Sequence, residues 1–479
     1  MSCGMAVLGS LWGLAQRVRV APEPVPRSAR VAPPAPLARP TLPATAPRFE
    51  QLEQAVWARY RPVVCAAVSA ALADEAAAQR AAARPVCCGH PMRRHDARAV
   101  TWQTWVGRVH ATVDRYRCRQ CGAEQRPLLD VLGGEPGRLS GWLARHLALL
   151  GSVVPYTLAA ELAAPLLGVH THAMMVWRAV QRLGAAAQTH TDALSTYHAA
   201  PTSVAPIVAS PPPAVVVAVD GCVIGTQARS TRRRRPTKTT PLAPLPPVLD
   251  GTFREVKTAV LLQPTDRVAL PDRAALVRRV VVTGLTDADG LFRQVSAALR
   301  ERGWLNPQTM IVIVGDGAEW IWHRAPLFAH RCEILDFWHA MEYAWAYARL
   351  QFGAGSRRAE QWTGRLAADL KAGHVHEVIA RLQALHPRAP DAAAAREAVV
   401  RYYTTHAHRM QYDDYLRRGY GIGSGAVESA HKQVVHARLR QAGMRWSVRG
   451  AQHVLALRAL LLNGTWDQTD QLRMARQAA

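Results

Sequence analysis

The sequence has few acidic residues and almost no lysine. Aspartate and glutamate number 35 against 59 lysines and arginines, which gives a formal net charge of +24 over 479 residues. Only four of the basic residues are lysines. A GC-rich genome also replaces lysine with arginine, so the charge itself is the informative part. A field of this sign attracts polyanions, and nucleic acid is the first partner to consider.

Long apolar runs are missing as well. No stretch approaches the ~20 consecutive apolar residues that a membrane-spanning helix needs. Residues 1–20 contain a short apolar run, but no basic residue precedes it and no small-residue cleavage site follows it, which argues against a secretory signal. We therefore expect a soluble cytoplasmic protein without a membrane partner.

A cysteine framework of the kind that staples secreted domains is also lacking. Four of the eight cysteines lie in one segment, which predicts a reducing compartment and a local metal site. Cys118 and Cys121 form a regular Cys-x-x-Cys knuckle, whereas the first knuckle, "CCGH", is irregular. Cys88 with either Cys87 or His90 would complete four zinc ligands. Reduced core cysteines are the alternative.

Composition and periodicity divide the chain into modules. Without an apolar period, residues 1–48 read as a disordered Pro/Ala-rich leader. The further predicted parts are a helix at 49–84, a zinc-ribbon-like module at 85–130, a helical module at 135–195, a linker at 196–213, an α/β domain at 214–345 and 418–465, intervening helices at 346–417 and a tail at 466–479.

Two patterns in the first half favour DNA binding. Alternating apolar residues predict two strands joined at Val106–Gly107 between the cysteine pairs. Two short helices joined near Gly168 then resemble a helix-turn-helix, with residues 171–183 in the recognition position and Arg178 and Arg182 as candidate DNA contacts. An ordinary helical hairpin is the competing interpretation, and the net charge favours DNA.

The second half alternates strand and helix. Apolar runs predict five strands and a helix at 288–303, which together indicate a mixed five-stranded sheet in an α/β domain. The strands are expected at 214–224, 254–262, 275–285, 309–317 and 331–337. A basic insert at 229–247 lies between the first two and suits either a DNA backbone or solvent.

Two aspartates end matching apolar runs. Asp220 closes "VVVAV" and Asp316 closes "MIVIVG", and each is followed by glycine. If the first and fourth strands are neighbours, their ends lie roughly 5 Å apart, where two carboxylates repel unless a cation lies between them. Hard oxygen ligands favour Mg²⁺ or Mn²⁺. An Asp-Gly turn is the simpler alternative for each position alone.

A third carboxylate follows a glycine-rich loop. In "GYGIGSGAVESAHK", residues 419–432, Glu428 lies in the first turn of a predicted helix, where an acidic residue also favours the helix end. The spacing does not fit a capping box, which would place the acid at Val427. Three carboxylates at one sheet edge can hold two metal ions for an in-line phosphoryl transfer.

Several motifs together resemble a known family. The resemblance is to bacterial insertion-sequence transposases of the ISKra4 type, a group of DDE transposases, and covers roughly residues 85–465. The motifs are "VAVDG" at 217–221, "REVKTAV" at 254–260, "VGDGAEWIW" at 314–322, "ILDFWHAMEYAW" at 334–345, "RMQY" at 409–412 and "GIGSGAVESAHKQVVHARLRQAGMRWS" at 421–447.

The resemblance implies an RNase H-like catalytic domain with an all-helical insertion at 346–417. It also implies a catalytic triad of Asp220, Asp316 and Glu428, and an accessory Asp-x-x-His element at Asp336 and His339. A polar helix start is the alternative for that element.

His431, Lys432 and Arg438 follow Glu428 and are candidate DNA contacts, with a solvated helix face as the competing interpretation. We expect a nucleoid-associated enzyme that binds its element's terminal inverted repeats and target DNA, pairs two ends as a homo-oligomer, and cleaves and joins strands with Mg²⁺. A catalytically inactive DNA-binding remnant and a metal-dependent nuclease without joining activity are the alternatives.

Overall fold

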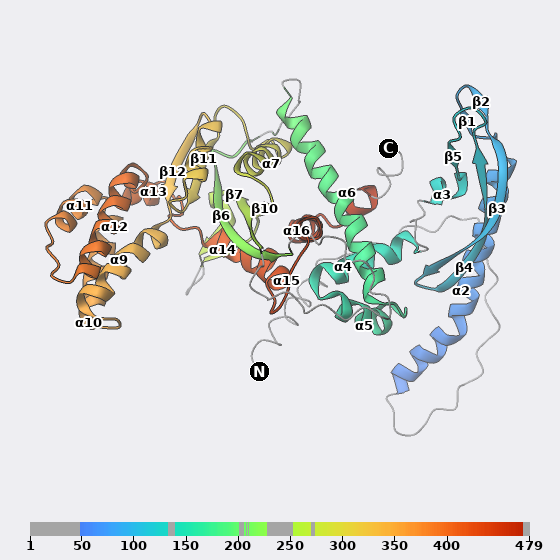
Figure 1. Ribbon diagram of the computed structural model, residues 1–479, viewed down its shortest axis with the longest axis horizontal. Coiled ribbons are helices and arrows are strands. Elements are labelled where there is room, and N and C mark those ends of the chain that lie inside the picture. Colours follow the sequence, from blue (N-terminus) through green and yellow to red (C-terminus); the bar gives the residue numbers. More distant parts are fainter. Residues whose placement is uncertain are drawn as a thin grey trace, which may run out of the picture. The chain divides into compact units, whose positions relative to one another are not determined.

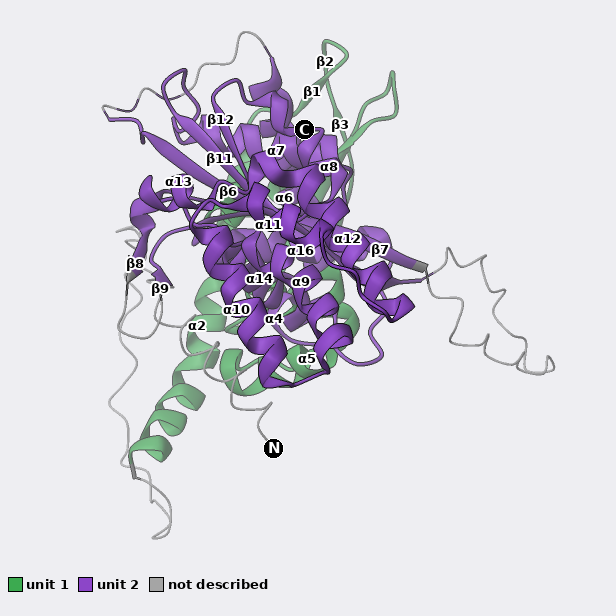
Figure 2. Ribbon diagram, turned by 90° about the vertical axis from the view of Figure 1, so that its left-hand side faces the viewer, with its two compact units in different colours: residues 1–151, 156–179, 467–479 green, residues 152–155, 180–466 purple. Residues whose placement is uncertain are grey.

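The computed structural model describes residues 48–132, 139–200, 206, 208, 210–227, 252–269 and 274–472. The predicted leader, except its last residue, and the basic insert at 229–247 lie outside these ranges. The chain divides into two compact units, one of residues 1–151, 156–179 and 467–479 and one of residues 152–155 and 180–466 (Figure 2). Within the described ranges, no helix is long and apolar enough to cross a bilayer.

The first unit contains a long helix packed on a hairpin. Helix α2 (Arg48–Ala81) lies against β4 (Gly107–Arg117), which pairs antiparallel with β3 (Arg93–Thr104) and confirms the predicted hairpin. The other elements are β1 (Val86–Cys87), β2 (His90–Pro91), β5 (Glu124–Gln125), α3 (Pro127–Leu132), α4 (Gly141–Val153) and α5 (Tyr156–Leu167).

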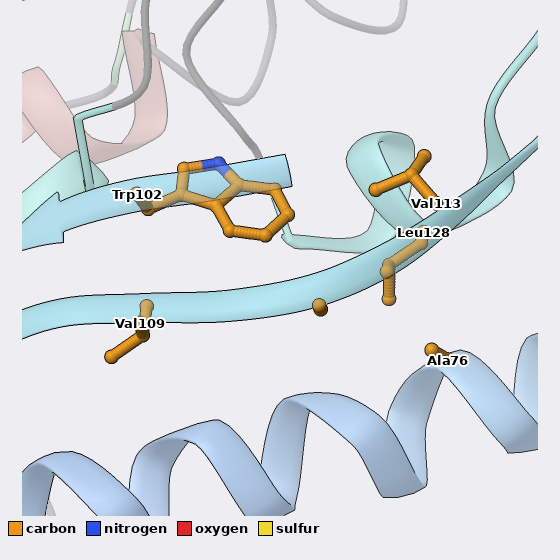
Figure 3. Packing of buried hydrophobic residues seen from close by; sticks show 6 residues of the cluster. Ala76, Trp102, Val109, Val113 and Leu128 are labelled. Carbon is orange, nitrogen blue, oxygen red and sulfur yellow. The ribbon is translucent and has the colours of Figure 1, made fainter. Parts of the chain in front are cut away.

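The hairpin and α2 share a hydrophobic core. Alternate residues of β4 point inward, as expected for a strand with one buried face. They pack with side chains from α2, β3 and α3 in a cluster of Ala76, Trp102, Val109, Ala111, Val113 and Leu128 (Figure 3). At the rim, Asp114 of β4 accepts hydrogen bonds from Arg80 of α2 (2.8 Å) and Arg94 of β3 (2.6 Å). This module therefore has a core besides its cysteines.

The predicted recognition helix is longer than expected. Helix α6 spans Ala173–Ala199, so the expected end at Leu183 and the linker start at 196 are wrong. Gly184 does not break the helix because it fits a close helix contact, where an added Cβ would lie 2.5 Å from the His453 side chain. Gln181 bonds the same histidine at 2.8 Å. Tertiary packing thus overrides the weak local preference of glycine.

The second unit is built on the mixed five-stranded sheet that the sequence predicts. Its order is β10-β7-β6-β11-β12, with β7 antiparallel to β6 and β10, and β11 parallel to β6 and β12. The central strands read as Val/Ile runs because both faces are buried. The strands are β6 (Ala214–Thr226), β7 (Thr252–Leu262), β10 (Val280–Gly284), β11 (Met310–Gly315) and β12 (Arg331–Leu335).

Two predicted boundaries in this unit need correction. The third strand is interrupted, because its first part forms β9 (Ala274–Leu276), which pairs with β8 (Arg267–Ala269) outside the main sheet. The proposed insertion boundary at 346 falls inside one continuous helix, α9 (Phe337–Phe352), whose N-cap is Asp336.

Helices cover the sheet and extend beyond it. α7 (Ala288–Glu301) packs on β7 and β10, α14 on β6 and β7, and α16 on β10, while α9 to α12 pack on one another (Figure 1). The remaining helices are α8 (Glu319–Trp322), α10 (Arg357–Lys371), α11 (Val375–Gln383), α12 (Pro390–His406), α13 (Tyr412–Arg417), α14 (Gly425–His431), α15 (Ala437–Leu439) and α16 (Val448–Leu462).

Candidate active site and candidate metal centre

Asp220 and Asp316 lie side by side across two parallel strands. β6 and β11 pair in a register that joins Ala218 to Val314, and the same offset places Asp316 beside Asp220. Neighbouring strands are about 4.8 Å apart. The expectation that the first and fourth strands are neighbours is confirmed, and with it a pair of carboxyl groups at one end of the sheet.

The surroundings of Asp316 oppose its negative charge. Burial raises the pKa of this carboxyl, and the negative charges of Asp220 and Asp336 raise it further. The backbone N–H of Ala318, which donates to Asp316 Oδ1 at 3.0 Å, and the nearby His339 act in the opposite direction. A cation between the aspartates would relieve this repulsion.

The glycines after the two aspartates serve close packing. β6 continues through Gly221 to Thr226, so Asp220-Gly221 is not a turn. A Cβ at Gly221 would lie 2.0 Å from Glu255 Oε1, and one at Gly317 would lie 2.5 Å from the Tyr402 ring. After each aspartate, the space that a Cβ would fill is therefore already taken by a side chain from elsewhere in the fold.

Glu428 lies on α14, and its carboxylate pairs with the C-cap lysine of the same helix. Its carboxylate is 64% exposed and contacts Lys432 Nζ at 2.7 Å, one helical turn along. Ser424 precedes the helix as its N-cap but makes no side-chain capping bond. The helix itself packs on β6 and β7, the strand of Asp220 and its neighbour. The backbone of α14 is thus at the sheet, while the Glu428 side chain is paired locally.

Two of the candidate DNA contacts, His431 and Arg438, are buried in this structure. His431 is 4% exposed, and its Nδ1 lies 3.4 Å from Asp220 Oδ2. Arg438 is 1% exposed, donates to Met444 Sδ at 3.6 Å and lies over the Trp446 ring.

The other candidate DNA contacts are accessible. On α6, Arg178 is exposed and Arg182 is half-buried. The Lys432 side chain is 66% exposed beside Glu428. Accessibility is compatible with a DNA contact and does not test it.

Asp336 joins the glycine loop to the sheet. It is 1% exposed, and its Oδ1 accepts the N–H groups of Trp338 (2.6 Å) and His339 (3.0 Å) at the start of α9. Its Oδ2 accepts the N–H of Ser424, and its own N–H donates to Gly315 O at 2.7 Å. Asp336 is therefore a polar helix start, as the alternative interpretation holds, and it also fixes Ser424, the residue that precedes α14, while an accessory role in the site stays a prediction.

A buried lysine on the strand next to that of Asp220 was not among the predicted site residues. Lys257 pairs with Glu255 and lies over the Trp320 ring at 4.0 Å. It faces Gly221 across the β6–β7 pair, one position from Asp220. The signal was present in the motif "REVKTAV", which contains one of the four lysines of the chain.

Four cysteine sulfurs lie together at one end of the hairpin module. The ligand atoms of Cys87, Cys88, Cys118 and Cys121 all lie within 4.8 Å of one another, whereas His90 is outside this group. Backbone N–H groups of Cys121 and Gln120 lower the pKa of Cys118 to about 6. A thiolate among three further sulfurs is the donor set that a structural zinc ion takes, so the residues fit this metal.

The turns that carry the sulfurs use unusual backbone conformations. Cys88 has φ 51° and Gly89 has φ 78°, so the first knuckle turns back within two residues. In the second knuckle, Gly122 has φ 76° and donates to Cys118 O at 3.1 Å. Sulfurs from two turns therefore converge. Of the two candidates for the fourth zinc ligand, Cys87 and His90, Cys87 belongs to this group.

Within the described ranges, the cysteine group is the one place where three or more His, Cys, Asp or Glu ligand atoms come this close together. The triad of Asp220, Asp316 and Glu428 does not meet that distance. A comparison with models of protein families and with curated proteins found no match to this chain.

Proposed function

We propose that this protein is a DNA transposase with an RNase H-like catalytic domain and an Asp-Asp-Glu triad. One observation carries the proposal: Asp220 and Asp316 are adjacent across parallel strands, and the helix that bears Glu428 packs on the strand of Asp220. Ligands of α/β sheets bind outside the carboxyl ends of parallel strands, which is where Asp316 follows β11.

The carboxylates fit Mg²⁺ or Mn²⁺, because they offer hard oxygen ligands and one of them has a raised pKa that a cation would lower. When bound, the metal supplies activation of the attacking water or 3′-hydroxyl and stabilisation of the leaving oxygen. Asp220 and Asp316 would hold it from the sheet. Glu428 would join them by leaving Lys432, a change of side-chain rotamer on an exposed residue.

The rest of the chain supports a DNA partner. The net charge of +24 favours phosphate binding. The cysteine module and the α5–α6 pair supply two small modules suited to recognition of element ends, with Arg178 on the exposed face of α6. Pairing of two ends would call for a homo-oligomer.

The test uses labelled DNA that carries the element's own ends, with Mg²⁺. We expect the wild type to cleave and join strands, and Glu428→Gln to bind the ends with unchanged affinity and do neither. Glu397→Gln, an exposed glutamate on α12, is the matched control and should retain full activity. Joining by Glu428→Gln would contradict the triad.

A binding-only remnant is the second candidate, because Glu428 is paired with Lys432 and the three carboxylates are not gathered. It predicts tight end binding by both proteins and chemistry by neither. Cleavage without joining by the wild type would identify a nuclease instead.

A further inference from the structure

A π-helical turn comes directly after α14. This turn, η5, spans Lys432–His436, and at its end the N–H of Ala437 bonds the carbonyl of Lys432, five residues back. In a regular α-helix that N–H would bond the carbonyl of Gln433, four residues back. A single π turn inside a helix leaves carbonyls in need of other donors and occurs frequently at functional sites.

Arg458 supplies those donors. From α16, its guanidinium donates Nη2–H to the carbonyl of Gln433 and Nε–H to that of Val434 (2.8 Å). Nη1–H donates to Ser152 O at 2.6 Å. Because the five N–H donors of arginine lie in one plane, a single side chain can serve several carbonyls in a fixed arrangement.

The placement of this arginine is costly. Its side chain is 6% exposed, and burial with the nearby Arg438 lowers its pKa to about 10, so it remains charged at neutral pH. The described hydrogen bonds of Arg458 all go to carbonyl oxygens, which compensate a buried charge less fully than a carboxylate. An apolar residue would fill the space at lower electrostatic cost, so the guanidinium calls for a specific reason.

The turn sets the direction of the helix face before it. One additional residue in a helix rotates the segment on its N-terminal side by about 100° relative to the segment on its C-terminal side, at 3.6 residues per turn. Glu428 and His431 are three residues apart and share a face. The His431 side of that face meets Asp220, since His431 Nδ1 lies 3.4 Å from Asp220 Oδ2, whereas the Glu428 side chain is 64% exposed at the edge of the face. Without the turn, packing of α15 and α16 would direct another face of α14 to the sheet.

We propose that Arg458 is a positioning residue for the carboxylate site: it holds the π-helical turn, and the turn directs the His431 side of α14 at Asp220, with Glu428 at the edge of the same face. The inference rests on the proposed function, because only a site formed jointly by α14 and β6 depends on this direction. Arg458 acts through the backbone of η5 and touches none of the three carboxylates in the described hydrogen bonds.

The test measures Mn²⁺ affinity of the full-length, zinc-loaded protein by electron paramagnetic resonance, without DNA. We expect Arg458→Met to weaken the site by about 10-fold or more, as loss of an outer residue does in metal sites. Arg458→Lys should restore part of the affinity, since an ammonium can donate to one of the carbonyls. Arg302→Met removes a partly buried guanidinium of the same unit that also donates to a carbonyl, Ala298 O, and should leave the affinity unchanged.

A second variant guards against simple unfolding. Deletion of Gln433 removes the additional residue and returns the segment to regular helix. We expect it to lose Mn²⁺ affinity as Arg458→Met does, while circular dichroism shows unchanged helix content. Wild-type affinity in both variants would overturn the inference alone. If the wild type binds no Mn²⁺, or if Asp220→Asn binds Mn²⁺ as tightly as the wild type, the proposed function fails, and the inference with it.

Discussion

The cysteine group and the carboxylate group solve the same problem of bringing ligands together in different ways. The four sulfurs lie within 4.8 Å of one another on two tight turns. At the sheet, Asp220 and Asp316 are adjacent but Glu428 pairs with Lys432 instead. A single thiolate and its neighbouring sulfurs can share a small space, whereas several carboxylates repel one another. A structural metal site can thus be assembled by folding alone. At the carboxylate site, Glu428 stays paired with Lys432 and must leave this partner before it can bind a cation.

Removal of the sulfurs is expected to have the largest effect. We expect Cys118→Ser with Cys121→Ser to abolish zinc binding, measured as metal content by mass spectrometry, because structural zinc contributes ~10–16 kcal/mol in zinc-finger peptides. Cys332→Ser, in the other unit, should retain zinc. Equal zinc in the double variant would show that these sulfurs are not ligands.

The extent of unfolding on zinc removal depends on how much core the hairpin module has without the metal. A small ribbon with little core of its own would unfold throughout residues 86–126. The hairpin instead shares a core with α2 around Trp102 and Val109. We therefore expect hydrogen exchange to increase in β1, β2 and β5 after chelation, while the Trp102 end of β3 stays protected. Uniform exchange along the hairpin would contradict this.

The two units should respond to pH with opposite signs. Asp316 has a raised pKa, so its proton is held more tightly in the folded chain, and stability falls as pH rises through that pKa. Asp114 is also opposed by burial, but Arg80 and Arg94 outweigh this and lower its pKa, so its contribution is lost as pH falls. Acid should thus destabilise the hairpin module. At Asp316 it should remove the unfavourable negative charge, because the carboxyl becomes protonated.

Asp316→Asn tests the first half of this contrast. The amide keeps the bond from Ala318 N–H without the charge, so we expect the metal-free protein to become more stable at pH 7. The gain should vanish at acid pH, where the wild-type carboxyl is protonated. Chemical denaturation at both pH values measures it. Asp289→Asn, an exposed control, should change little.

The two glycines offer a smaller effect with an internal comparison. At Gly317 an added methyl group meets the Tyr402 ring, which is held by stacking on Tyr343 at 4.0 Å between ring centroids. At Gly221 it meets the far end of the Glu255 side chain, which can rotate away. We expect Gly317→Ala to cost ~1–3 kcal/mol, as overpacking does, and Gly221→Ala less. The reverse order in thermal denaturation would show that Tyr402 is the more adaptable neighbour.

The sequence predicted what depends on local pattern and register. Five apolar runs became the five strands of the sheet, and matching positions in two of them placed Asp220 beside Asp316. The cysteine spacing likewise identified the metal-ligand cluster. These features follow from periodicity, which a single sequence contains.

Features that depend on distant contacts were not predictable. Arg438 and His431 read as surface cations, but Trp446 and Asp220 bury them. The π-helical turn after α14 has no local signature, since the donor to its carbonyls is Arg458 on another helix. For the same reason the helix face shared by Glu428 and His431 could not be oriented from periodicity, which assumes 3.6 residues per turn.

Replacing Lys432 should have the smallest effect on folding. It tests most directly whether the ion pair of Glu428 competes with a bound cation. Its bond to Glu428 joins two exposed side chains four residues apart, a contact worth about 0.3–0.5 kcal/mol. Lys432→Met should therefore leave unfolding within about 0.5 kcal/mol of wild type by denaturant titration. Because the pair competes with a cation for Glu428, we expect Mn²⁺ to bind more tightly in this variant, and zinc at the cysteines to be unchanged. Weaker Mn²⁺ binding would instead mean that Lys432 helps to orient Glu428, and that the carboxylate site is already arranged by its own ion pair.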